Sequence, residues 1–391
     1  MIALEKTRPV WIEVNLDHLA HNMKEVRKAV KTGVLVTAVI KADGYGHGAV
    51  EIADTLLKNG ADRLAVATLS EAIELRRVYE EVPILVMGYT PESCAEEVVK
   101  NNIIQTVYSF EQAEGFSKAA QLFEKEAVLH IKVDTGMSRL GFQPDITTVE
   151  AIKKIAELPN IKIEGIFTHF AVADEKDKSF TNQQYSKFME LVERLNMDGV
   201  RIPIQHCSNS AAIIDLQHYN LDMVRAGIML YGLYPSDEVN KEEVKLKQVM
   251  ALKAKISHLK ELGPGIGVSY GLKHVTAGKA KIATLPIGYA DGFTRMLSGK
   301  AEVLVKGNRV PVIGRICMDQ CMIDVTGIDD LHRGDVVTII GREGEQEISI
   351  DEVAAKLGTI NYEVVCMMGK RIPRVYIRKG EVIKIKDYLL E

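Results

Sequence analysis

A lysine follows the first strongly apolar run of the chain, in the stretch VIKADGYGHG at residues 39–48. Its glycines, Gly44, Gly46 and Gly48, are spaced by two. A dinucleotide fingerprint needs the spacing G-x-G-x-x-G at the start of a helix, so the pattern disfavours a dinucleotide loop. In an enclosed site the ammonium form of a lysine is disfavoured, and the free amine can form a Schiff base with an aldehyde. Lys41 is therefore either a nucleophilic amine or a solvated lysine at a strand end.

A second group of charged residues occupies VLHIKVD, residues 128–134. Strand alternation places His130, Lys132 and Asp134 on one face and the aliphatic residues on the other. If the aliphatic face meets helices, Lys132 points to the interior, close to Arg139 in DTGMSRLGF. Two converging cations need an anion between them. Either Asp134 supplies it, or Lys132 is itself modified to an anion; a register that turns Lys132 outward is the remaining alternative.

Further polar residues follow later apolar runs. His169 stands in FTHFAVADE, Ser210 in HCSNSAA, and Arg225 and Gly227 in VRAGIMLYG. The Ser210 hydroxyl and the amides of Gly227 and Ile228 are suited to a phosphate group. Taken singly, each has a structural explanation: a helix cap, a turn or a core histidine. Together with an amine they indicate one site.

The second half of the chain adds a tyrosine on a glycine-rich loop. Tyr270 lies in GPGIGVSYG, and Met318 and Asp319 lie at a strand junction in GRICMDQCMIDVT. No helical pattern follows the glycine loop, which disfavours phosphate binding there. Such a loop can instead project Tyr270 away from its own domain and into another subunit.

The elements that position these residues alternate between strand and helix. Segments with apolar residues three or four apart, such as SEAIELRRVYEE and TNQQYSKFMELVERLN, separate short β-rich runs. This alternation predicts right-handed βαβ units, and eight of them in about 230 residues predict a closed (β/α)8 TIM-type barrel with its active site at the carboxyl ends of the strands. The eight runs are residues 34–40, 63–68, 83–88, 105–109, 128–134, 163–170, 202–208 and 223–232.

The pattern changes near residue 236, where SDEVNKEEVK is charged and has no apolar face. Glycine-broken β-like runs follow, and only SIDEVAAKLG looks helical, with Ser349 as its cap. We therefore expect a barrel in residues 1–240 and a mostly β domain in residues 241–391. The first 12 or so residues are expected to pack with the second domain.

Composition narrows the class of protein. The 391 residues carry a formal net charge of −4, and no lysine-rich stretch is present to bind nucleic acid or a membrane surface. Five scattered cysteines form neither a disulfide framework nor a paired zinc pattern, so no metal is expected. The first residues lack a basic segment followed by an apolar core, and no stretch of about 18 apolar residues occurs. These features predict a cytoplasmic protein with a small-molecule substrate.

Taken together, the motifs resemble those of alanine racemases, enzymes of fold-type III that depend on pyridoxal 5′-phosphate (PLP). The likeness spans essentially the whole chain, with AVIKADGYGHG similar to the PLP attachment signature. The other matching motifs follow in family order: KVDTGMSRLGF, FTHFAVADE, NSAA, VRAGIMLYGL, VSYG, PIGYADG, GRICMDQ and GTINYE.

The resemblance implies a homodimer with shared active sites that interconverts L- and D-alanine and supplies D-alanine for bacterial peptidoglycan. Lys41 would hold PLP and act as one base, and Tyr270 of the partner subunit would act as the other, on the opposite face of the substrate. Lys132 matches a position that is N-carboxylated in many members, so its carbamate would be the anion beside Arg139. The remaining matches are cofactor contacts (Tyr45, Arg139, His169, Asn209, Ser210, Arg225, Gly227, Ile228 and Tyr362), substrate contacts (Arg139 and Met318), supporting residues (His206 and Asp319) and the substrate entrance (Asp174, Tyr289, Arg295 and Arg315).

One position departs from the family pattern, because the family usually has glycine where Ser138 stands. If that position requires a positive φ, serine is strained there and the aim of Arg139 is affected. Alternative functions are a serine or broad-specificity racemase and a fold-type III amino-acid decarboxylase. A PLP-binding protein made of a single barrel would lack the second domain, and a Schiff-base aldolase would lack PLP.

Overall fold

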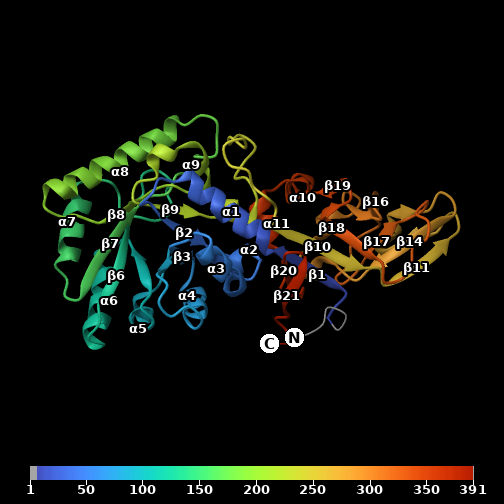
Figure 1. Ribbon diagram of the computed structural model, residues 1–391, viewed down its shortest axis with the longest axis horizontal. Coiled ribbons are helices and arrows are strands. Elements are labelled where there is room, and N and C mark those ends of the chain that lie inside the picture. The colour runs from blue at the N-terminus through green and yellow to red at the C-terminus, as the bar shows by residue number, and fades with distance from the viewer. Residues whose placement is uncertain (1–6, 391) are drawn as a thin grey trace. The chain divides into compact units, whose positions relative to one another are not determined.

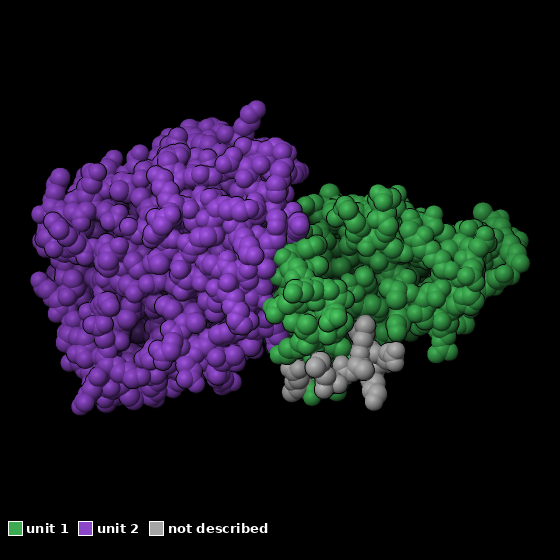
Figure 2. All heavy atoms as spheres, in the orientation of Figure 1, with its two compact units in different colours: residues 1–18, 45–48, 248–391 green, residues 19–44, 49–247 purple. Residues whose placement is uncertain are grey.

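The computed structural model describes residues 7–390, which fold into two compact units (Figure 2). Unit 1 takes the described residues up to His18, the segment Tyr45–Gly48 and the residues from Gln248 onward. Unit 2 takes Leu19–Gly44 and Ala49–Lys247. The chain thus leaves unit 2 for four residues directly after the Lys41 turn.

Unit 2 contains the predicted barrel. Its eight strands are all parallel and pair in the order β8-β7-β6-β5-β4-β3-β2-β9. Amides of Asp222 and Arg225 donate to the carbonyls of Gln205 and Ser208 at 3.1 and 3.0 Å, which joins the last two strands and closes the ring. The strands are β2 (Leu35–Val39), β3 (Arg63–Val66), β4 (Ile84–Val86), β5 (Ile104–Val107), β6 (Ala127–Lys132), β7 (Ile161–Phe167), β8 (Ile204–His206) and β9 (Met223–Ala226).

Helices surround these strands, as the ribbon shows (Figure 1). Thr68, Ser109 and Asp145 each accept a hydrogen bond from an amide in the first turn of the helix that follows, so caps fix where three of the helices begin. The expected helical segments are confirmed. The helices are α1 (Leu16–Ala29), α2 (Lys41–Tyr45), α3 (Ala49–Lys58), α4 (Leu69–Arg76), α5 (Ala95–Lys100), α6 (Phe110–Leu122), α7 (Ile146–Ala156), α8 (Ser179–Met197) and α9 (Ser210–Asp215), with 3-10 turns η2 (Glu92–Cys94), η3 (Gln217–Tyr219) and η4 (Ile228–Tyr231).

Unit 1 is mostly β, as predicted. An 11-stranded sheet runs in the order β11-β14-β17-β16-β15-β18-β10-β1-β20-β21, with β19 paired to β18. The first described strand, β1, lies antiparallel to β10 and parallel to β20. The strands are β1 (Val10–Asn15), β10 (Met250–Lys255), β11 (His258–Leu262), β14 (Ala280–Leu285), β15 (Glu302–Val305), β16 (Asn308–Ile313), β17 (Cys321–Asp324), β18 (Val336–Glu343), β19 (Gln346–Ile348), β20 (Arg374–Arg378) and β21 (Glu381–Lys386), beside the separate pair β12 (Gly267–Val268) and β13 (His274–Val275).

Two helices form in unit 1, although the sequence predicted one. Helix α10 (Ile350–Leu357) begins as expected, because the Ser349 hydroxyl accepts the amide of Glu352 at 3.0 Å. The second helix, α11 (Asn361–Cys366), was missed because six residues show no helical period and Ile360 offers no side-chain cap. The 3-10 turns are η5 (Tyr270–Leu272), η6 (Tyr289–Asp291) and η7 (Arg295–Leu297).

Candidate active site

The turn that carries Lys41 is left-handed. Ala42, Asp43 and Gly44 have φ angles of 51°, 54° and 61°, and Tyr45 follows at 51°. A left-handed conformation costs a residue with a side chain about 1–2 kcal/mol. Such strain persists only where surrounding contacts impose it, and it gathers at functional sites.

Glu71 supplies one of those contacts. Its Oε1 accepts the amide of Ala42 at 2.6 Å, while Oε2 accepts the amides of Ala67 and Thr68 at 2.9 and 3.1 Å. Thr68 caps α4 in return, so Glu71 is held in a capping box. The β3–α4 loop is thereby bonded to the Lys41 turn, a link that the sequence analysis did not find. The only signal for it was the capping pattern T-x-x-E.

The interior of unit 2 encloses Lys132. Only 6% of this residue is exposed, and its Nζ donates to the carbonyl of Val133 at 3.0 Å and lies 5.1 Å from the centroid of the Phe167 ring. Burial, with a contribution from Arg225, lowers the pKa of Lys132 to about 7. Lys132 is thus poised between its charged and neutral forms near neutral pH.

Asp134, one of the two candidate anions, is engaged elsewhere. Its carboxylate accepts the amides of Gly136 and Ser138 at 2.9 and 3.0 Å and that of Arg139 at 3.0 Å. Burial opposes ionisation, but these amide bonds bring the pKa of Asp134 below its ordinary value. Asp134 therefore organises the loop that carries Arg139 rather than forming an ion pair with Lys132. In that loop Ser138 has φ 57°, the left-handed conformation that favours the family's glycine.

A cluster of donors lies at the starts of α9 and η4. Asn209 caps α9 by accepting the amide of Ala212 at 3.1 Å. The Ser210 hydroxyl oxygen accepts the amide of Gly227 at 2.9 Å, which leaves the Ser210 hydrogen to donate elsewhere. The η4 turn starts directly after Gly227, at Ile228. This donor set suits a phosphate group.

Arg225 is buried and held from two sides. Its NH1 group donates to Nδ1 of His206 at 2.7 Å. Its NH2 group donates to the carbonyls of Thr168 and Cys207 at 2.9 and 3.0 Å and faces Nδ1 of His169 at 3.2 Å. Burial lowers the pKa of Arg225 to about 10, so its guanidinium remains charged at neutral pH.

Positive charge concentrates around His169. Burial comes first among the causes that lower the pKa of this imidazole well below its ordinary value, and nearby cations add to it. His169 thus stays neutral in a strongly positive environment, which favours an anionic ligand. The cations are Arg225, Lys132, Arg139 and Lys41.

In unit 1, two tyrosines from separate segments approach each other. The rings of Tyr45 and Tyr362 are 6.3 Å apart between centroids. Burial, with the neighbouring Tyr362 and Cys366, raises the pKa of Tyr45, so its hydroxyl keeps its proton and can serve as a donor. The two predicted phosphate contacts of this unit therefore lie together.

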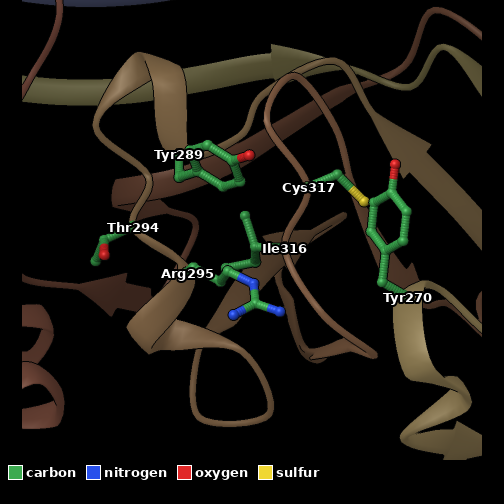
Figure 3. Close-up of a pocket in the computed structure, with 6 residues that line it drawn as sticks. All are labelled: Tyr270, Tyr289, Thr294, Arg295, Ile316 and Cys317. Atoms are coloured by element: carbon green, nitrogen blue, oxygen red, sulfur yellow. The ribbon is translucent and has the colours of Figure 1, made fainter.

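A separate cavity of unit 1, of about 610 Å³, brings together Tyr270, Tyr289 and Arg295 (Figure 3). Thr294, Ile316 and Cys317 complete its lining. Tyr270 is 69% exposed, as expected for a side chain that projects away from its own domain.

The wall of this cavity depends on a close backbone approach. The amide of Tyr289 donates to the carbonyl of Cys317 at 3.0 Å, and a Cβ at Gly288 would lie 2.2 Å from that oxygen. Only glycine fits there. Met318, which is 53% exposed, and Arg315 flank the Ile316–Cys317 segment without lining the cavity, and Asp319 pairs with Arg371 at 2.8 Å.

Two absences hold for the described part of the chain. Residues 7–390 contain no group of three or more His, Cys, Asp or Glu side chains placed to bind a metal. None of the helices within that range is long and apolar enough to cross a membrane.

Comparison with known proteins identifies the family. The alanine racemase N-terminal domain matches residues 14–235, and the alanine racemase C-terminal domain matches residues 249–376. The chain belongs to the alanine racemase family.

Similar proteins support this. An alanine racemase of Methanococcus maripaludis is 53% identical over 371 residues, covering 95% of this chain and 99% of the relative. One from Clostridium novyi is 50% identical, covering 98% and 99%. A solved alanine racemase of Clostridium difficile 630 superposes with a TM-score of 0.95 at 47% identity, covering 98% of this chain and 100% of that one. A histidine racemase of Leuconostoc mesenteroides is also similar, with a TM-score of 0.88 at 28% identity, covering 95% and 99%.

Proposed function

We propose that this protein interconverts L-alanine and D-alanine with PLP bound at the carboxyl ends of the unit 2 strands. The carrying observation is the concentration of four cations around a neutral His169 in a chain of the alanine racemase family. PLP carries an anionic phosphate and a phenolate, so its charge matches this site. In bacteria the D-alanine would serve peptidoglycan synthesis.

The residues of the site fit PLP. Lys41 supplies the amine for its aldehyde, and Arg225 a donor for its ring nitrogen. Bound PLP accepts the electron pair that remains on Cα when the substrate loses its proton. The phosphate would be held by Tyr45, Ser210, Gly227, Ile228 and Tyr362, with Asn209 beside them and His169 against the ring.

Racemisation requires a proton to leave one face of Cα and another to arrive on the opposite face. Lys41 would hold the proton on one side, and Tyr270 of the partner subunit would hold it on the other. Arg225 cannot accept a proton while it is charged, so it would keep the ring nitrogen unprotonated. That arrangement favours return of the proton to Cα over transamination.

Lys132 would become the anion that the site needs. Its pKa of about 7 leaves a large share of neutral amine, which attacks CO2 to form a carbamate and releases one proton. The carbamate would orient Arg139, which with Met318 would hold the substrate carboxylate. His206 and Asp319 would support the site, and Asp174, Tyr289, Arg295 and Arg315 would line its entrance.

A racemase for serine or for several amino acids is the nearest alternative, and the similarity to a histidine racemase keeps it open. A fold-type III decarboxylase is the more distant one. Rates measured with alanine, serine and histidine, together with CO2 release, separate these possibilities.

The test of the proposal is a racemisation assay of purified protein supplied with PLP, in both directions. We expect interconversion of the alanine enantiomers, and we expect Lys41→Ala to abolish it together with the visible absorbance of lysine-bound PLP. Lys58→Ala, which removes an exposed lysine of α3, is the matched control and should keep both. Survival of both signals in Lys41→Ala would refute the assignment.

A further inference from the structure

A chain of hydrogen bonds continues inward from Arg225 through unit 2. Nδ1 of His206 accepts from Arg225 at 2.7 Å, and Nε2 of His206 lies 2.9 Å from Nδ1 of His130. Nε2 of His130 lies 3.0 Å from Oε2 of Glu164, whose carboxylate pairs with Arg63 at 2.5 and 3.3 Å. The five residues come from β9, β8, β6, β7 and β3.

The backbone is shaped to admit this chain. In the pairing of β6 with β7, Leu129 faces Ile163 and His130 faces Gly165, so Glu164 is an extra residue in a β-bulge. Bulges re-aim side chains and occur beside functional sites. A Cβ at Gly165 would lie 2.4 Å from the His130 ring, so glycine is required there. The bulge thus turns Glu164 towards an imidazole for which Gly165 leaves room.

The direction of the hydrogen bonds is fixed from one end. A guanidinium can only donate, so Nδ1 of His206 must be the acceptor and its proton must sit on Nε2. That N–H donates to Nδ1 of His130, whose own proton must then sit on Nε2 and point to the carboxylate of Glu164. Both imidazoles, each completely buried, therefore occupy one tautomer.

Charge within the chain supports the same state. Burial opposes ionisation of Glu164, but hydrogen bonds from His130 and Arg63 bring its pKa down to about 2. Burial lowers the pKa of His130, and burial with the charge of Arg225 lowers that of His206 further. The charged groups that face the two imidazoles are Glu164, Arg63, Arg225 and Lys132.

A proton added to this chain has no place. Protonation of His130 would set its Nδ1–H against the N–H of His206. A change of tautomer in His206 would only move the conflict to Arg225, where two donors would meet. Phe167 also holds His206 in place, because the two rings stack at 4.6 Å between centroids and 7° between planes.

We propose that Glu164 and Arg63 are positioning residues that, through His130 and His206, fix Arg225 in a single orientation as a charged donor. This inference rests on the proposed function, because it assigns Arg225 to the PLP ring. Neither Glu164 nor Arg63 touches substrate or cofactor, and each acts through the two histidines.

The first test uses protein without PLP, in which nitrogen NMR of 15N-labelled histidine reports each tautomer. We expect His130 and His206 to be neutral and protonated on Nε2 between about pH 6 and pH 8. In Glu164→Gln the amide can donate as well as accept, so a second tautomer should appear. A buried imidazole protonated on Nδ1 or on both nitrogens in the unsubstituted protein would overturn the inference.

The second test compares holoenzyme variants. Glu164→Gln should lower kcat by about tenfold while KM for alanine changes less than about twofold, because the substrate site is untouched. Glu126→Gln, an equal charge change at an exposed glutamate near Lys162, is the matched control and should leave kcat unchanged. Arg63→Lys, which keeps the positive charge, should cause a smaller fall and serves if Glu164→Gln does not fold.

The outcomes separate this inference from the proposed function. Loss of all racemase activity in the unsubstituted protein rejects the function, whereas the tautomer measurement still decides the hydrogen-bond chain. Wild-type kcat in both variants, or a loss that falls on KM alone, rejects the inference while leaving the function intact.

Discussion

Ser138 sits in a loop that is organised around one carboxylate. Asp134 accepts the amides of Gly136, Ser138 and Arg139, and these three bonds hold the backbone at Ser138 at φ 57°. The condition under which serine would be strained at this position is therefore met. Because the bonds use backbone amides, glycine could replace serine without losing any of them.

We predict that Ser138→Gly raises the free energy of unfolding by about 0.5–1 kcal/mol, because relief of the left-handed strain outweighs the added freedom of the unfolded chain. Urea denaturation measures it. Ser138→Ala keeps the Cβ and the strain, so it should show no gain. A less stable Ser138→Gly protein would show that the serine side chain contributes something that the hydrogen bonds do not reveal.

Which residues could be predicted depended on the range of the signal. Lys132 was placed in the interior from alternation along one strand, and its burial agrees with that. The pairing of Arg63 with Glu164 was invisible, because the two residues are 101 positions apart and a β-bulge moves Glu164 out of simple alternation. Glu71 was likewise missed, since its bond to Ala42 connects two different loops.

At the scale of elements, the strained Lys41 turn is stabilised by its neighbour α4. The carboxylate of Glu71 uses one oxygen for the cap of α4 and the other for the amide of Ala42. A helix start therefore holds the left-handed turn that presents Lys41. The geometry of the catalytic amine depends on an element that contributes no reacting group.

We predict that Glu71→Gln destabilises unit 2 by about 1–2 kcal/mol and weakens PLP binding, since an amide has one acceptor oxygen where the carboxylate serves donors with both. Thermal unfolding without PLP and a PLP titration measure the two effects. Glu74→Gln, on the exposed face of the same helix, carries the same charge change and should alter neither. Equal behaviour of the two variants would remove Glu71 from this role.

Elements with a clear period were predicted, and those without one were not. All eight barrel strands and the β-rich character of the second half follow from runs of alternating or continuous apolar residues. The left-handed α2 carries no such signal, because Ala42 and Asp43 are ordinary in right-handed structure. Helix α11 is too short for a period to emerge.

At the scale of the whole molecule, the proposed catalytic residues divide between the two units. Lys41 belongs to unit 2, and Tyr270 belongs to unit 1, where its side chain is largely exposed. A tyrosine that acts as a base needs an enclosed position close to the substrate. We therefore place Tyr270 in the active site of the partner subunit, so that one protomer alone would hold an incomplete site.

Mixing two inactive variants tests this arrangement. In a dimer of one Lys41→Ala subunit and one Tyr270→Phe subunit, one site pairs the intact Lys41 with the intact Tyr270, and the other site lacks both. Random exchange makes about half of the dimers mixed, each with one working site of two, so about a quarter of wild-type activity should return. Each variant re-mixed with itself is the control. If mass-tagged subunits prove to have exchanged and no activity returns, both bases must come from the same chain.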